Sequence, residues 1–331
     1  MPELSRESVS VFAPAATAEL GARIAAALGL PVGKLEETTY TGGERKLRPL
    51  ESVRGRSVYV VQSMFGDAQG SANDRLCSLL FLIGALKDAG ARRVSACIPY
   101  LAYARQERRA AARDPVTTRY TAQLFEAVGV DQVIALEVHD RTAFDNSFRC
   151  AASHLEAAAL FVRHLGASAA GQEFAVATPD IGGAKRARHV QELLQAAIGR
   201  PVNFAIVDKK RTRDTVSGDL FAGDVAGRRV VILDDLISSG TTVLHAIDAC
   251  RRAGATHIEV AATHASFGKA ALRIFESGKP DSLIVTDSVP LSGGFLSYLN
   301  KSLTVLSIAP VFAEAIRRLE QGGSMSELAG S

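Results

Sequence analysis

Short aliphatic runs alternate along the chain with stretches in which apolar residues recur at helical spacing. Aliphatic runs of this length are typical of strands buried on both faces, as in a parallel sheet. They predict strands at residues 9–13, 58–62, 93–99, 132–138, 173–178, 202–207, 229–233, 258–263, 283–286 and 303–308. The helical patterns predict helices at residues 15–28, 73–89, 117–128, 153–165, 182–197, 242–250 and 311–319, with Asn73 and Asp74 capping the second. Strands and helices that alternate in this way indicate an α/β fold of βαβ units, with mostly parallel sheets flanked by helices.

The chain also repeats its own plan. A strand, a phosphate-sized loop, a helix, an Ala-Gly-Ala stop and the next strand occur around residues 58–96 and again around residues 230–260. Glycine is common at the end of any helix in such units, but the shared order of all these parts favours two related domains. We expect a first domain at residues 1–150, a second at 151–308, and a C-terminal helix and tail at 309–331 that pack on the first.

The stretch from Val230 to Thr242 has the clearest chemistry. An aliphatic strand ends in Asp234 and Asp235, and the small-residue loop Ser238–Thr242 leads into a helix. Backbone N–H groups at such a helix start favour an anion, and ligands bind at the carboxyl ends of strands in open α/β sheets. The stretch therefore predicts a phosphate cradle beside carboxylates that hold sugar hydroxyls or hydrated Mg²⁺. The alternative is a solvated Asp-Asp turn followed by a Ser/Thr helix cap.

Other polar stretches also follow predicted strands: Pro99–Arg109, Leu136–Asp140, Thr178–Arg186 and Asp208–Arg213. The first combines tyrosines and arginines, which suits a stacked purine with phosphates nearby. The second carries His139, and the third has Asp180 before a double glycine. The fourth is a basic run that we expect to be a mobile loop able to close over phosphoryl charge. Each has a plainer explanation, as a surface loop, a structural histidine or a solvated charge run, but all lie at the same end of their strands.

Composition narrows the class of protein. The 331 residues are 47% hydrophobic and 22% charged, with a net charge of +3, which is too slight to argue for a nucleic-acid partner. The four cysteines have no zinc-type spacing, and no apolar run is long enough to span a membrane. The N-terminus has no signal-peptide pattern. We therefore expect a cytoplasmic protein without a membrane or nucleic-acid partner.

Five motifs together resemble those of the ribose-phosphate diphosphokinase (PRPP synthetase) family, over roughly Glu36 to Leu319. They are Glu51–Gly55, Tyr103–Gln106, Pro179–Arg186, Gly223–Val225 and Ala313–Arg318. The resemblance implies two tandem type I phosphoribosyltransferase-like domains, the first on the ATP side and the second on the ribose 5-phosphate side. It also implies transfer of the diphosphoryl group of ATP to the C1 hydroxyl of ribose 5-phosphate, which gives phosphoribosyl diphosphate (PRPP) and AMP for nucleotide biosynthesis.

The same resemblance implies roles for individual residues. Lys209 and Arg211 would be catalytic, and Mg²⁺ would be held at His139 and Asp180. ATP would contact Arg105 and Gln106, together with Gly42, Gly43 and Glu44 from a neighbouring subunit. Ribose 5-phosphate would bind Asp234, Asp235, Ser238, Ser239, Gly240, Thr241 and Thr242. The family's shared ATP site further implies a homo-oligomer built from dimers, such as a hexamer.

The chain departs from the family pattern at three places. Gly42 stands where the family has an aspartate, Glu137 precedes the metal-site histidine where an aspartate is usual, and Thr241 stands where a glycine is expected. We expect Thr241 to restrict the loop if that position needs a positive φ. Two other functions stay open: a non-catalytic regulatory paralogue of PRPP synthetase, and a phosphoribosyltransferase that consumes PRPP.

Overall fold

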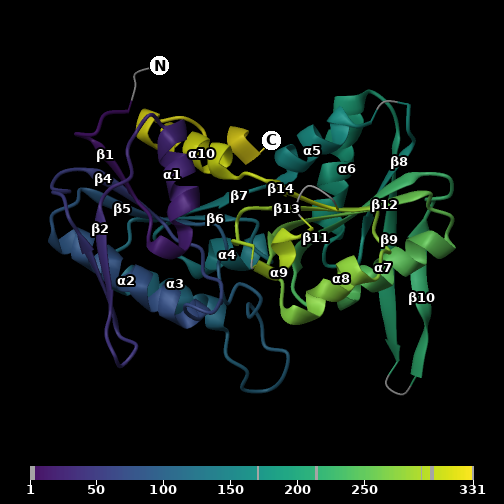
Figure 1. The fold of residues 1–331 in the computed structure, drawn as a ribbon, viewed down its shortest axis with the longest axis horizontal. Coiled ribbons are helices and arrows are strands. Elements are labelled where there is room, and N and C mark those ends of the chain that lie inside the picture. Colours follow the sequence, from purple (N-terminus) through teal and green to yellow (C-terminus); the bar gives the residue numbers. More distant parts are fainter. Residues whose placement is uncertain (1–3, 170, 213–214, 292, 299–301, 330–331) are drawn as a thin grey trace. The chain divides into compact units, whose positions relative to one another are not determined.

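The computed structural model describes residues 4–169, 171–212, 215–291, 293–298 and 302–329, without the side chains of residues 208–220, 269, 293 and 329. The chain divides into two compact units, one formed by Met1–Glu156 with Ile308–Ser331 and the other by Ala157–Ser307 (Figure 1). Each unit is built around its own largely parallel sheet.

The first unit has a parallel five-stranded sheet in the order β1-β4-β5-β6-β7. Its strands are β1 (Val9–Phe12), β4 (Ser57–Val61), β5 (Arg93–Ile98), β6 (Gln132–Leu136) and β7 (Ala151–Leu155). Every residue of β1, β4 and β6 is buried, as the aliphatic runs predict for strands with helices on both faces.

Helices cover both faces of this sheet (Figure 1). They are α1 (Ala18–Ala27), α2 (Ala72–Asp88), α3 (Thr117–Ala127), α4 (Arg141–Ser147) and α10 (Ala309–Gln321). The C-terminal helix α10 is tied to the sheet by Glu320, whose carboxylate accepts hydrogen bonds from the Tyr59 hydroxyl, at 2.6 Å, and from Arg93. A separate antiparallel hairpin, β2 (Leu35–Thr39) and β3 (Arg45–Pro49), projects from the unit.

The second unit has a seven-stranded sheet in the order β10-β9-β8-β11-β12-β13-β14, parallel except for β10. Its strands are β8 (Phe174–Thr178), β9 (Val202–Thr212), β10 (Thr215–Gly223), β11 (Arg229–Ile237), β12 (His257–Ala265), β13 (Ser282–Thr286) and β14 (Leu303–Leu306). Its helices are α5 (Ala158–Ala167), α6 (Ala184–Ile198), α7 (Thr241–Arg252), α8 (Leu272–Glu276) and α9 (Gly293–Leu296). Short 3-10 turns lie at Lys269–Ala271 in this unit and at Ala15–Thr17 and Glu327–Ala329 in the first unit.

The structure differs from the sequence prediction at several elements. The helix expected at residues 153–165 is wrong at its start, because Ala151–Leu155 pairs with β6 as β7 and the helix begins at Ala158. The segment before β4 forms the β2–β3 hairpin. Helix α2 is capped by Ser71, whose hydroxyl accepts from the Asp74 amide while Asp74 accepts from the Ser71 amide. Asp74 therefore belongs to a capping box, and the cap lies two residues before Asn73.

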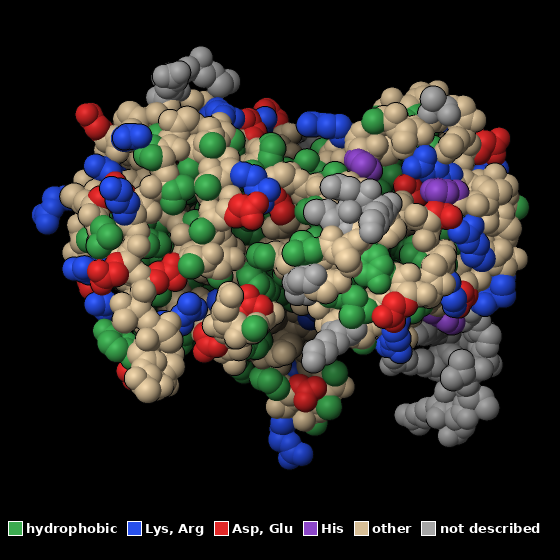
Figure 2. Space-filling model, in the orientation of Figure 1, with side chains coloured by type: hydrophobic (Ala, Val, Ile, Leu, Met, Phe, Trp, Pro, Cys, Tyr) green, Lys and Arg blue, Asp and Glu red, His purple; other side chains and the backbone are tan. Residues whose placement is uncertain are grey.

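Charged side chains of both signs are interspersed over the face shown in Figure 2, in keeping with the small net charge of +3. Within the described residues, no helix is both long and apolar enough to cross a membrane.

Candidate active site

The carboxyl edge of the second sheet carries the acidic residues that the sequence singled out. Asp180 follows β8, and Asp234 and Asp235 lie near the end of β11, the strand next to β8. Their shared edge follows from the parallel register, in which Ile232 lies opposite Ala177. The Asp235 amide donates to Asp234 Oδ1 at 2.8 Å, which orients the Asp234 carboxyl group.

Burial and negative neighbours raise the pKa of Asp234 to about 8. The main cause is loss of hydration, followed by repulsion from Asp235 and, more weakly, from Asp180. The buried Asp235 has a cation beside it, since Arg186 Nη2 in the first turn of α6 lies 3.8 Å from Asp235 Oδ2. Arg186 belongs to the motif Pro179–Arg186, but its pairing with Asp235 was not predicted from sequence. A perturbed carboxylate of this kind at a strand end is typical of a ligand site.

The loop after β11 has the shape that a phosphate cradle needs. Gly240 has a φ of 75°, which favours glycine, and a Cβ there would lie 2.4 Å from the Ile274 Cδ1 atom, so another residue would also force the Ile274 side chain to shift. Ser238, Ser239, Thr241 and Thr242 are exposed. The condition under which Thr241 would restrict the loop is not met, because the positive φ belongs to Gly240 and Thr241 is the first residue of α7.

The double glycine after β8 serves the local fold. A Cβ at Gly183 would lie 2.5 Å from Thr178 Oγ1, so α6 can start this close to β8 only with glycine. The Gly183 amide donates to Asp180 Oδ1 at 2.8 Å and orients that carboxyl group. The exposed Asp180 therefore points from a fixed turn at the sheet edge.

Lys209 and Arg211 lie in β9, which continues to Thr212 and pairs with β10 as an antiparallel hairpin. The loop expected after residue 207 is thus an extension of the strand, in which Lys209 is opposite Asp219. The side chains of Lys209 and Arg211 lie outside the described part of the structure.

In the first unit, the loop after β5 turns at Tyr103, which has a φ of 66°. Its carbonyl accepts from the Gln106 amide at 3.1 Å and from Thr118 Oγ1 at 2.8 Å, and these bonds hold the turn. Arg105 and Gln106 are exposed beyond it. The neighbouring Glu107 was missed from sequence: its Oε2 atom is buried and has no hydrogen-bond partner among the described residues. Positive φ in a non-glycine residue costs about 1–2 kcal/mol, so this loop is held in shape by its surroundings.

His139 follows the neighbouring strand β6 and is exposed. Glu137, before it, is buried and has a φ of 43°, and its amide donates to the Leu155 carbonyl of β7 at 2.8 Å. Asp140 accepts from the Ala143 amide at 2.8 Å as the cap of α4, so it serves the fold. This strained turn directs His139 to the same edge of the first sheet as the Arg105 loop.

Gly42, Gly43 and Glu44 form the exposed tip of the β2–β3 hairpin. Tyr40 closes the turn, because its amide donates to the Glu44 carbonyl at 2.8 Å and its own carbonyl accepts from the Gly43 amide at 2.8 Å. A Cβ at Gly42 would meet no atom within 4 Å.

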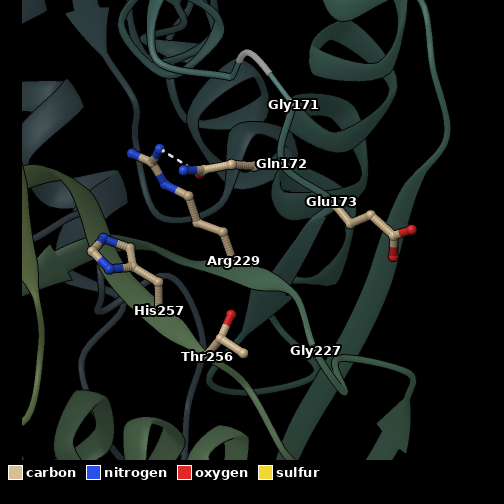
Figure 3. Close-up of a pocket in the computed structure, with 7 residues that line it drawn as sticks. All are labelled: Gly171, Gln172, Glu173, Gly227, Arg229, Thr256 and His257. Atoms are coloured by element: carbon tan, nitrogen blue, oxygen red, sulfur yellow. Dashed lines mark hydrogen bonds between the residues drawn. The ribbon is translucent and has the colours of Figure 1, made fainter.

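A cavity of about 600 Å³ in the second unit lies at the opposite, amino edge of the sheet (Figure 3). It is bordered by residues at the starts of β8, β11 and β12, among them Glu173, Arg229 and His257. Arg229 is already bound, by Glu259 at 2.7 Å and Gln172 at 3.0 Å. The cavity is therefore separate from the carboxyl edge that carries the candidate site.

Two family models match the chain. The model for the N-terminal domain of ribose phosphate pyrophosphokinase matches residues 9–129, and the model for the phosphoribosyl synthetase-associated domain matches residues 205–329. The chain belongs to the ribose-phosphate pyrophosphokinase family.

Curated relatives and a solved structure agree with this assignment. Ribose-phosphate pyrophosphokinases of Caldanaerobacter subterraneus and Fusobacterium nucleatum are each 34% identical, over 97% of this chain and 98% of theirs. The enzyme of Listeria ivanovii is also 34% identical, over 97% of this chain and 96% of its own. The crystal structure of phosphoribosylpyrophosphate synthetase from Mycobacterium smegmatis matches with a TM-score of 0.83 and 29% identity, covering 96% of this chain and all of that one. The predicted family and the fold of two phosphoribosyltransferase-like domains are confirmed.

Proposed function

We propose that the first unit binds ATP and the second binds ribose 5-phosphate, and that the chain joins them into PRPP with release of AMP. PRPP synthesis is the activity of the pyrophosphokinase family to which the chain belongs. The assignment of ribose 5-phosphate to the second unit rests on one observation. Asp234 and Asp235 lie beside the Ser238–Thr242 loop at the carboxyl edge of its sheet. Carboxylates suit sugar hydroxyls, and a glycine turn at a helix start suits a phosphate.

In the reaction, the C1 oxygen forms a bond to the β-phosphorus of ATP, and the bond from that phosphorus to the α,β-bridging oxygen breaks. The C1 hydroxyl loses its proton, and AMP leaves with the bridging oxygen. Such transfers depend mainly on positioning and on compensation of charge. Asp234 and Asp235 would position the ribose, Arg105 and Gln106 the ATP, and Lys209 with Arg211 would supply positive charge at the diphosphoryl oxygens.

The donor atoms fit Mg²⁺ carried by the nucleotide. Within the described residues, no three or more His, Cys, Asp or Glu side chains are grouped so as to hold a metal ion by themselves. Mg²⁺ usually keeps several waters and binds through one or two carboxylates plus substrate phosphates. The exposed carboxylate of Asp180 fits that partial role, and the family resemblance adds His139, which is also exposed at a sheet edge. When bound, Mg²⁺ would neutralise charge on the phosphoryl oxygens.

The hairpin tip suggests that the site is completed between copies of the chain. Gly42, Gly43 and Glu44 are exposed at the end of a two-stranded projection, and we propose that they reach the ATP of a neighbouring subunit in a dimer-based homo-oligomer.

The four cysteines are free thiols, two of them buried, which suits the reducing cytoplasm.

The test is to incubate the protein with Mg²⁺, ATP and ribose 5-phosphate and to follow AMP and PRPP by phosphorus NMR. Equal amounts of AMP and PRPP are expected, with neither formed when ribose 5-phosphate is omitted. Absence of both products, with inorganic phosphate also supplied, would refute the proposal and favour a regulatory paralogue. Release of diphosphate from added PRPP only when a base is present would favour a phosphoribosyltransferase.

A further inference from the structure

The turn that leads into β4 of the first sheet and the turn that leads into β11 of the second are held by the same kind of backbone hydrogen bond. In the first unit the Gly55 amide donates to the Gly90 carbonyl at 2.8 Å; in the second, the Gly227 amide donates to the Gly254 carbonyl at 2.9 Å. All four glycines have positive φ. These repeated bonds make β4 and α2 of the first unit the counterparts of β11 and α7 of the second.

The match can be followed residue by residue along the two strands. β4 begins at Ser57, opposite Arg93 in β5, and β11 begins at Arg229, opposite His257 in β12. Counting onward, Val61 corresponds to Leu233. The next two residues of the first unit, Gln62 and Ser63, therefore stand where the second unit has Asp234 and Asp235.

The first unit has no acidic pair at these positions. Gln62 and Ser63 are fully buried, and Gln62 Nε2 donates to the Ser63 carbonyl at 2.8 Å. These side chains are turned into the protein and offer no carboxylate to a sugar.

The loop that corresponds to the phosphate cradle already holds an anion of its own. Asp67 Oδ1 accepts from the amides of Gln69, at 2.8 Å, and Gly70, at 3.1 Å. Its Oδ2 lies 2.6 Å from Nη2 of Arg75, in the first turn of α2. Successive amides and a guanidinium around oxygen atoms are the groups that bind phosphate in proteins.

The guanidinium group of Arg75 is held by contacts with this loop. Its residue is 1% exposed, its Nη1 atom donates to the carbonyls of Phe65 and Gly70, and its guanidinium lies 3.7 Å from the centroid of the Phe65 ring. Burial by itself would raise the pKa of Asp67, but the Arg75 guanidinium and the two amides outweigh it, so its pKa lies below the ordinary value. The carboxylate is thus held in its charged form.

We propose that Asp67 is a built-in anion that fills the former phosphate cradle of the first unit, so that each chain takes a sugar phosphate only in its second unit. Removal of the Asp67 carboxylate would then leave the buried Arg75 guanidinium and two backbone amides without their anion, at a loop that solvent ions can reach. The inference rests on the repeated fold and does not depend on the proposed reaction.

The experiment compares the full-length wild type with Asp67→Ala by thermal unfolding, with and without sulfate or acetate. In anion-free buffer Asp67→Ala should melt below the wild type, because the buried Arg75 loses its partner. Either anion should then raise the melting temperature of Asp67→Ala by roughly 2–5 °C more than that of the wild type. The rise in the melting temperature of the wild type measures the stabilisation that comes from sulfate bound at the second unit. Equilibrium dialysis with labelled sulfate should find one more bound anion per chain in the variant.

Two control variants isolate the cause. Asp67→Asn keeps the volume filled and should show no extra gain from anions. The double variant Asp67→Ala/Arg75→Met lacks the guanidinium and should also gain no more than the wild type. If Asp67→Ala yields too little folded protein, Asp67→Ser serves in its place. Equal gains in the wild type and the single variant, or in the single and double variants, would overturn the proposal.

Discussion

Replacing Asp234 with asparagine should stabilise the protein while impairing the reaction. The asparagine Oδ1 atom can still accept from the Asp235 amide, so the change removes charge with little change of shape. The pKa of Asp234 is raised from 3.8 to about 8, so ionisation of this group opposes folding. The opposing free energy is absent below the unfolded-state pKa, grows as the pH rises, and becomes constant above about pH 8.

The size of the effect follows from the shift. One pKa unit corresponds to about 1.4 kcal/mol. The rise in the pKa of Asp234 from 3.8 to about 8 therefore sets an upper limit of about 6 kcal/mol on the free energy by which its ionisation opposes folding. Because the Asp234 residue is partly exposed and part of the shift is repulsion by Asp235, we expect about 2 kcal/mol at pH 8. For a unit of this size, that corresponds to roughly 4–8 °C in melting temperature.

The assay is thermal unfolding of the wild type and Asp234→Asn from pH 4 to pH 9, without Mg²⁺ or phosphate. The variant should gain stability steadily as the pH rises and lose its advantage near pH 4. Its activity should fall by about 10–100-fold through loss of a charged hydrogen bond to the ribose. A variant that is less stable than the wild type at pH 8 would refute the reasoning.

Asp281→Asn in the same unit is the matched control with the opposite sign. Asp281 accepts from the Ile258 amide at 2.6 Å and pairs with Arg251, and these interactions outweigh burial and lower its pKa. A lowered pKa contributes stability that is present above the unfolded-state pKa and lost as the pH falls through the folded-state pKa. This variant should therefore be destabilised at neutral pH, and the loss should shrink as the solution becomes acidic.

Three further predictions concern the candidate site. Lys209→Ala should lower kcat by several orders of magnitude while ATP binding, measured by calorimetry, stays nearly intact; near-normal turnover would contradict its role. Gly42→Asp has open space at the hairpin tip, so it should fold normally and lower KM for ATP or change the preference between ATP and GTP; unchanged steady-state kinetics with both nucleotides would count against this tip as an ATP contact. Gly240→Ala combines a positive φ with a 2.4 Å approach to Ile274, and should cost about 2–4 kcal/mol of stability and raise KM for ribose 5-phosphate. A fully stable Gly240→Ala with unchanged KM would show that the loop tolerates another backbone conformation.

Most buried strands could be predicted from sequence because an aliphatic run has few other stable places in an α/β fold. The segments that were misjudged have mixed composition. Ala151–Leu155 contains alanine, serine and histidine and lies at the sheet edge with partly exposed residues, so nothing in its pattern distinguishes a strand from a helix. The β9 extension at 208–212 is mostly charged and resembles a loop; its strand form depends on pairing with β10, which the sequence around it does not reveal.

The same division applies to the site. The residue types at the strand ends predict an anion cradle with carboxylates beside it, and the structure brings Asp180, Asp234 and Asp235 to one edge of the second sheet because β8 and β11 are parallel neighbours. Whether Thr241 is strained could not be decided from its identity, because the positive φ falls one residue earlier, at Gly240.

By itself, then, the sequence determined the family, the two-part α/β plan and the residues at the strand ends, because these depend on local pattern and motif. Only the tertiary structure decided the state of the charges. Asp234 has a raised pKa mainly because the folded chain excludes water from it and, more weakly, because β8 places Asp180 near it, whereas Asp67 has a lowered pKa because α2 brings Arg75 against its loop. Asp234 near the end of β11 and Asp67 in the loop after the matching strand β4 thus acquire opposite properties, since electrostatic free energy depends on distances in the folded chain and on exclusion of water.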